Sequence, residues 1–158
     1  MKKLLLILTL AFTLSANAQS FNEDKTTFSN FLKRMYTSAP FEGVKIVDDY
    51  DHQYLVSIIS LDKAKYSDPS IMNRVAQVKA QSQANTFLNG ASISMDMIIK
   101  TTEKTSKDSS STVVETIEDI RQNSTGFTQG LELLTKFENA DNKRMVFVYM
   151  RELIKEKK

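Results

Sequence analysis

The sequence predicts an α+β domain in which one long helix packs on a sheet, with an additional amphipathic helix before it. The prediction rests on the spacing of apolar residues, which changes along the chain. In two segments, 20–37 and 71–88, they recur every three or four residues, as on one face of a helix. Elsewhere they alternate or form short runs rich in β-branched and aromatic residues, which favour strands.

The first 18 residues have the pattern of a secretory signal peptide. Lys2 and Lys3 precede an apolar run, Leu4–Leu14, and Ala16-Asn17-Ala18 supplies the small-x-small pattern that signal peptidase accepts. The apolar run is about half as long as a membrane-spanning helix. We therefore expect cleavage after Ala18, no stable membrane anchor after cleavage, and a periplasmic or secreted protein.

Composition bounds the mature chain further. Without Lys2 and Lys3, 19 basic residues balance 19 acidic ones, and this balance argues against a nucleic-acid partner, which requires a basic surface. The chain has no cysteine, which excludes a lipobox and thiolate catalysis. We expect a single domain over 19–158, with the N-terminal helix at about 20–37 and the core at about 43–154.

The N-terminal helix is predicted from its apolar stripe and from its ends. Ser20 and Glu23 have the spacing of a capping box, and Pro40 ends the helix because the residue before a proline avoids the α conformation. Such a stripe usually covers one face of its own domain. A membrane surface or a partner protein is the alternative. The stripe consists of Phe28, Phe31, Leu32 and Met35.

Two strands, 43–50 and 53–61, are predicted next around a polar turn, and the most regular helix follows at 71–88. Pro69 lies near the start of this helix, where its missing N–H does no harm. Asn89-Gly90 provides a stop. Small side chains line the buried face and allow close approach to a sheet. They form a ridge of Met72, Ala76, Ala80 and Ala84, widened by Val75 and Val78 and ended by Phe87 and Leu88.

Alternating apolar residues predict a further strand over 93–99, and 103–112 is a polar loop. The spacing of apolar residues in 113–121 fits a helix, but its β-branched content after a strand and a loop favours a returning antiparallel strand, which is our prediction. A closing hairpin is predicted from 131–137 and 145–153. It echoes the first hairpin, since in each a glycine precedes two apolar strands joined by a polar turn.

These elements predict one shared core. The alanine ridge, with Val75 and Phe87, is expected to pack against Ile93, Met95, Met97 and Ile99. The hairpin residues expected to share or extend that core are Val56, Ile58, Val146 and Val148.

Three motifs contain residues of the kinds found in catalytic or metal-binding sites. The run Asp48–His52 contains the only histidine, but its spacing does not match a calcium loop and its residues are typical of turns. Ser60-x-x-Lys63 lacks the other elements of penicillin-recognising enzymes, and Gly90–Ser94 lacks the final glycine of a nucleophile elbow. We therefore predict no catalytic, cofactor-binding or metal-binding residues, and no enzyme activity.

The order of elements has a family resemblance. A strand (Tyr54–Leu61) leads into the alanine-ridged helix NRVAQVKAQSQANTFLNG, then into a long strand pair and the hairpin GLELLTKFENADNKRMVFVYM. Over roughly 44–153 this resembles the family of the twenty-kilodalton membrane-associated bacterial surface lipoprotein. The resemblance implies a curved antiparallel sheet around one helix, a dodecin-like arrangement, and a non-catalytic envelope protein. The lipid-accepting cysteine of that family is absent.

We therefore expect an exported envelope protein that acts through protein–protein interaction or assembly. Its partner would be an envelope component or a second copy, because open sheet edges can pair between copies. The alternative is a small-molecule binding module with an apolar pocket between helix and sheet. Methionines at strand spacing would suit its wall, namely Met95, Met97, Met145 and Met150.

Overall fold

The computed structural model describes residues 23–49, 52–90, 97–100, 114–115, 117–118, 120–121 and 126–153. The predicted signal peptide, 1–18, and the polar segment 103–112 lie outside them. No helix in this described part is long and apolar enough to cross a membrane. The elements are α2 (Glu23–Ser38), β1 (Gly43–Asp49), β2 (His52–Asp62), α3 (Pro69–Gly90), β3 (Ile98–Lys100), the 3-10 helix η3 (Phe127–Gly130), β4 (Glu132–Glu138) and β5 (Arg144–Glu152).

The strands form one five-stranded mixed sheet in the order β3-β1-β2-β5-β4. Both predicted hairpins are present, and their second strands, β2 and β5, pair antiparallel at the centre of the sheet. The prediction of a wholly antiparallel sheet is wrong, because β3 pairs parallel to β1, with Ile98 opposite Ile46. Alternating hydrophobicity predicts a strand but not the direction of its neighbour, so the sequence pattern could not predict this parallel pair.

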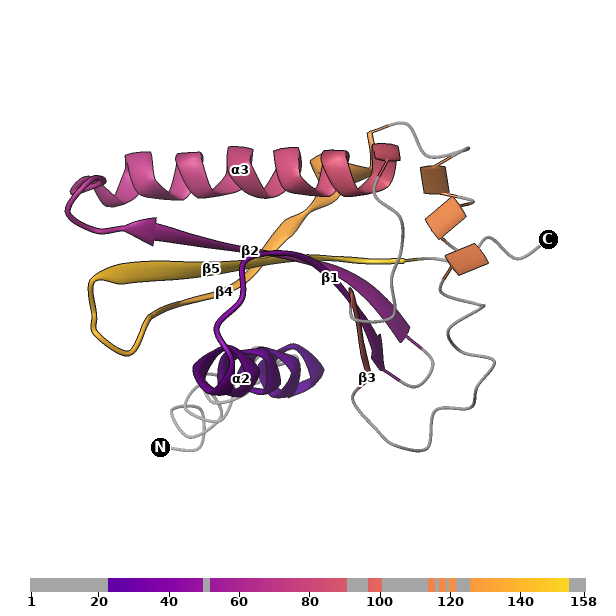
Figure 1. Cartoon of the computed structure of the whole chain (residues 1–158), viewed down its shortest axis with the longest axis horizontal. Coiled ribbons are helices and arrows are strands. Elements are labelled where there is room, and N and C mark those ends of the chain that lie inside the picture. Colours follow the sequence, from indigo (N-terminus) through magenta and orange to yellow (C-terminus); the bar gives the residue numbers. More distant parts are fainter. Residues whose placement is uncertain are drawn as a thin grey trace, which may run out of the picture.

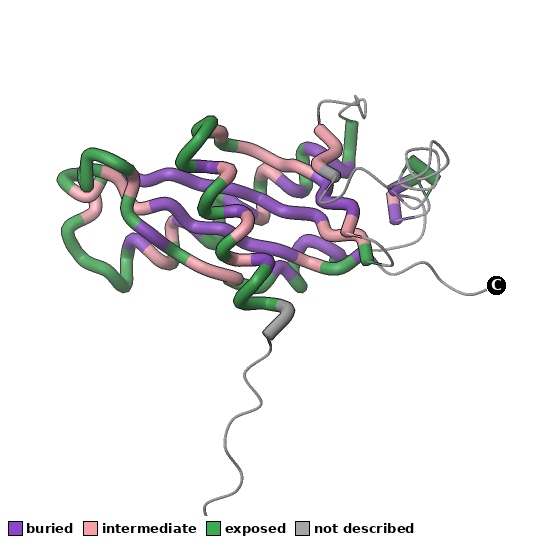
Figure 2. Tube along the Cα trace, turned by 90° about the horizontal axis from the view of Figure 1, so that it is seen from below, coloured by how far each residue is buried: buried purple, intermediate pink, exposed green. Residues whose placement is uncertain are grey.

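The sheet lies between the two helices, with α3 on one face and α2 on the other (Figure 1). Along β2, Leu55 and Ile59 belong to the α3-side core, whereas Val56 and Ile58 belong to the α2-side core. Both faces of the central strands are therefore buried, as the purple stretches of the strands show (Figure 2). The prediction of one shared core is wrong for four residues, which lie under α2: Val56, Ile58, Val146 and Val148.

The long helix α3 packs directly on the sheet through its alanine ridge. Ala76, Ala80 and Ala84 are fully buried, and the Ser57 hydroxyl on β2 donates a hydrogen bond to the Ala80 carbonyl at 3.3 Å. Asp68 caps the start of the helix, since its Oδ1 accepts the Ser70 N–H at 2.7 Å. The helix continues through Asn89 and Gly90, which the sequence predicted as its stop.

The strand predicted to face the ridge is shorter than expected. Met97 packs at the margin of the α3-side core, whereas Ile99 packs against the α2-side core. Ile93 and Met95 lie outside the described residues. Among the described strands, α3 packs mainly against β2, and also against β1 and β5.

The prediction of a strand over 113–121 is wrong, because the described residues of this segment are helical. Ile117 and Ile120, three positions apart, are both buried in the α3-side core. Arg121 donates to the Phe87 carbonyl at 3.0 Å and pairs with Glu118 at 2.6 Å. The Phe87 carbonyl is in the last turn of α3, where carbonyls lack a partner within the helix. In this segment the helical spacing of the apolar residues is therefore a better indicator of the structure than their β-branched content.

Candidate functional site

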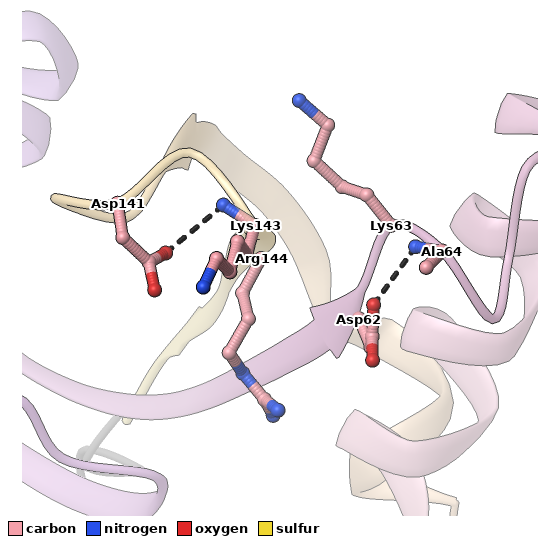
Figure 3. Close-up of a pocket in the computed structure, with 6 residues that line it drawn as sticks. All are labelled: Asp62, Lys63, Ala64, Asp141, Lys143 and Arg144. Atoms are coloured by element: carbon pink, nitrogen blue, oxygen red, sulfur yellow. Dashed lines mark hydrogen bonds between the residues drawn. The ribbon is translucent and has the colours of Figure 1, made fainter.

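A hollow of about 530 Å³ lies where two loops meet at one end of the sheet (Figure 3). One loop follows β2 and the other joins β4 to β5. The Lys63 N–H donates to the Lys143 carbonyl at 2.9 Å and ties the loops together. The lining residues are Asp62, Lys63, Ala64, Asp141, Lys143 and Arg144.

Two aspartates stabilise the turns that line the hollow. Asp62 accepts the Ala64 N–H at 2.8 Å, and Asp141 accepts the Lys143 N–H at 2.9 Å, so each closes a turn with its own backbone. Asn142 lies between Asp141 and Lys143 in the second turn and has a φ of 57°, a left-handed backbone conformation that asparagine tolerates well. The Lys143 N–H also lowers the pKa of the Asp141 carboxyl from its usual value, and the Lys143 charge acts in the same direction. The fully exposed Asp141 is therefore ionised at neutral pH.

Two of the three cations of the hollow, Lys63 and Arg144, are held by neighbouring groups. Lys63 pairs with Glu138 at 2.5 Å. Arg144 donates through Nε to the Ser60 hydroxyl at 2.6 Å and through Nη2 to the Ser60 carbonyl at 2.7 Å, and Nη2 also lies 3.3 Å from Glu42. The hollow therefore presents fixed charges of both signs, an arrangement that suits several charged side chains of a partner better than a single ion.

The Ser60-x-x-Lys63 motif lies beside the hollow but does not form a nucleophile pair. Ser60 is buried, and its hydroxyl accepts a hydrogen bond from the Arg144 guanidinium, while Lys63 binds Glu138. A guanidinium cannot take a proton from serine. The serines of the other motif, Ser92 and Ser94, lie outside the described residues.

The described residues of the Asp48–His52 run, 48, 49 and 52, do not converge on one point. Asp48 is buried and lies opposite Gln53, whereas His52 lies opposite Asp49. His52 Nδ1 lies 2.7 Å from Glu152 Oε1, and the His52 ring stacks on Tyr54 at 6.1 Å. Among the described side chains, no three His, Cys, Asp or Glu residues gather as metal ligands. Residues 50 and 51 lie outside the described part.

The methionines suggested for an apolar pocket are on opposite faces of the sheet. Met145 packs against the α3-side core, whereas Met150 belongs to the α2-side core. Met97 lies beside the α3-side core, and Met95 is outside the described residues. The described members therefore do not line one wall.

Sequence reasoning missed the hollow. The polar turn predicted between 131–137 and 145–153 contains Asp141, but no pattern placed this turn against Asp62. Their proximity depends on the pairing of β2 with β5, which brings Asp62 opposite Arg144. That pairing joins segments about eighty residues apart in the chain.

The fold and the hollow define an α+β domain with a mixed sheet between two helices and a charged surface site. No protein-family model, curated protein or solved structure matches the chain. The family resemblance in the sequence stays a prediction.

Proposed function

We propose that the protein is a non-catalytic exported envelope protein that acts through protein–protein interaction or assembly. The observation that carries the proposal is the hollow between the two loops. Four of its five charged groups, Asp62, Lys63, Asp141 and Arg144, are held by turns, hydrogen bonds or ion pairs before any partner arrives, so binding would cost little additional ordering of these side chains. Fixed charges of both signs select a partner with the complementary pattern and discriminate against others.

The hydrogen bonds around Ser60 support a structural role for this residue. A serine nucleophile needs a base within hydrogen-bond reach. Ser60 has the guanidinium of Arg144 at that distance instead, and both groups hold the end of β5 against β2. The export part of the proposal comes from the signal-peptide pattern of residues 1–18, and the envelope role from the family resemblance.

The test is purification of the protein from its own envelope fraction, followed by native mass spectrometry. Lys143→Glu reverses one charge of the hollow, and Lys79→Glu makes the same change on the exposed side of α3. We expect a partner chain to stay bound to the wild type and to Lys79→Glu, and its retention to fall about tenfold or more in Lys143→Glu. Equal retention by both variants would contradict a role for the hollow. A small bound mass that is lost on denaturation would favour the small-molecule binding module instead.

A further inference from the structure

We infer that α2 is an exchangeable helix that docks on the sheet of a second copy, so that two chains assemble by trading their N-terminal helices. This inference rests on the proposed assembly function and names a second copy of the chain as the partner. It is carried by the way α2 is attached, by the connection that follows it, and by the face that it covers.

Side chains make the attachment of α2. Phe28 contacts Tyr54 with ring centroids 4.9 Å apart, and Tyr36 contacts Phe137 at 5.5 Å. An ion pair between Lys25 of α2 and Glu132 of β4 spans 3.4 Å, and both side chains are more than half exposed. Within the described residues, no backbone–backbone hydrogen bond joins α2 to the sheet. Each of these contacts can be made equally well by the same helix of another copy.

The helix α3 is attached differently. Its alanines bring its backbone close to the sheet, and three of its carbonyls accept hydrogen bonds from outside the helix. The donors are the side chains of Ser57, Arg121 and Tyr149. Fewer residues of α2 than of α3 lie close to a strand. This is expected, because large aromatic side chains hold the backbone of α2 further from the sheet than the alanines of α3 do. Of the two helices, α2 is therefore the one that can leave with the least rearrangement.

A short connection, residues 39–42, joins α2 to β1. Phe41 and Glu42 contact the body of the protein: the Lys45 ammonium of β1 lies 5.8 Å from the centre of the Phe41 ring, and Glu42 pairs with Arg144. The Phe41 ring also contacts Tyr36 of α2, a contact that the helix of a second copy would have to replace. Ala39 and Pro40 are exposed between these anchors and the end of the helix. Proline favours an extended preceding residue, so the open form of this hinge is accessible. Short hinges of this kind favour exchange between copies.

The face under α2 determines the occupant. It is a continuous apolar surface, so a helix that swings away without replacement would expose it to water. The helix shown to complement this face is α2 itself, and every copy of the chain carries it. Closed and exchanged forms make the same contacts, so protein concentration and the hinge decide between them. The buried residues of this face are Val47, Val56, Ile58, Phe137, Val146, Val148 and Met150.

The exchange can be tested with a zero-length carbodiimide cross-linker on residues 19–158. Equal amounts of ¹⁴N- and ¹⁵N-labelled protein are unfolded together, refolded at high concentration and cross-linked. The Lys25–Glu132 pair reports on α2, because its two residues lie on the helix and on β4. The Lys63–Glu138 pair is the internal control, because both residues stay on the body in either form.

Exchange predicts that about half of the cross-linked Lys25–Glu132 peptide combines a light and a heavy chain, as random pairing of equal amounts gives. The Lys63–Glu138 peptide should stay unmixed. Native mass spectrometry of the same sample should show dimers. A Lys25–Glu132 peptide that contains only light or only heavy chains would overturn the inference. A protein that stays monomeric at every concentration in native mass spectrometry would also overturn it, even if no Lys25–Glu132 cross-link were recovered. The Lys143→Glu test does not involve α2, so failure of the exchange is distinguishable from failure of the proposed function.

Discussion

Ala80→Leu tests the packing of α3 on the sheet. Ala80 is fully buried, as are Ala76 and Ala84 one turn away on either side, so three additional carbons have no free space at the seam. Overpacking of this kind costs about 1–3 kcal/mol in free energy of unfolding. If the helix moves outward, the hydrogen bond from Ser57 to the Ala80 carbonyl is lost as well, which adds about 1 kcal/mol. For a domain of this size the melting temperature should fall by roughly 3–12 °C.

The measurement is urea unfolding of residues 19–158 followed by circular dichroism at constant pH. Lys79→Leu is the matched control, since it introduces the same side chain at the neighbouring, exposed position with similar helix propensity. We expect this control to stay within about 0.5 kcal/mol of the wild type. If Ala80→Leu unfolds at the same urea concentration as Lys79→Leu, the close helix–sheet seam is refuted.

Three further outcomes are expected from the same unfolding assay. A Cβ at Gly130 would collide with the Arg151 guanidinium, which stacks on Phe127, so Gly130→Ala should cost about 1 kcal/mol and be non-additive with Arg151→Ala. Burial raises the pKa of the Tyr149 hydroxyl, so above about pH 10 this hydroxyl ionises more readily in the unfolded chain than in the folded protein. The free energy of unfolding should therefore fall as the pH rises through this range, and it should fall less steeply in Tyr149→Phe. Ile117→Ala should cost about 2–4 kcal/mol because Ile117 is fully buried, whereas a value near zero would contradict its place in the core.

Sequence patterns predicted the elements of this fold better than the assignment of residues to its faces. Both hairpins and α3 follow from local spacing and turn residues, and their bounds agree within a few positions with 43–61, 71–88 and 131–153. The run Tyr54–Leu61 is apolar with little alternation, which is typical of a strand covered on both sides. Treating it as half of a single core led to the wrong face for Val56 and Ile58.

The remaining differences come from long-range contacts. The 113–121 segment has helical spacing and β-branched residues, and local propensity alone does not decide between helix and strand. The α3-side core decides it, because Ile117 and Ile120 reach that core together only from a helix. The hollow depends in the same way on the β2–β5 pairing, and turn chemistry around Asp141 could predict its fold but not its neighbours.

The two helices show how residue size sets the nature of an attachment. The small side chains of α3 bring backbone groups into hydrogen-bond range of the sheet and make the contact specific to one position in the chain. The aromatic stripe of α2 buries apolar area with side chains alone, and apolar burial is non-directional. Such a contact is strong without requiring that the helix and the sheet belong to the same chain. The stripe of α2 therefore covers its own domain, and in the exchange that we propose the same side chains would also join two copies.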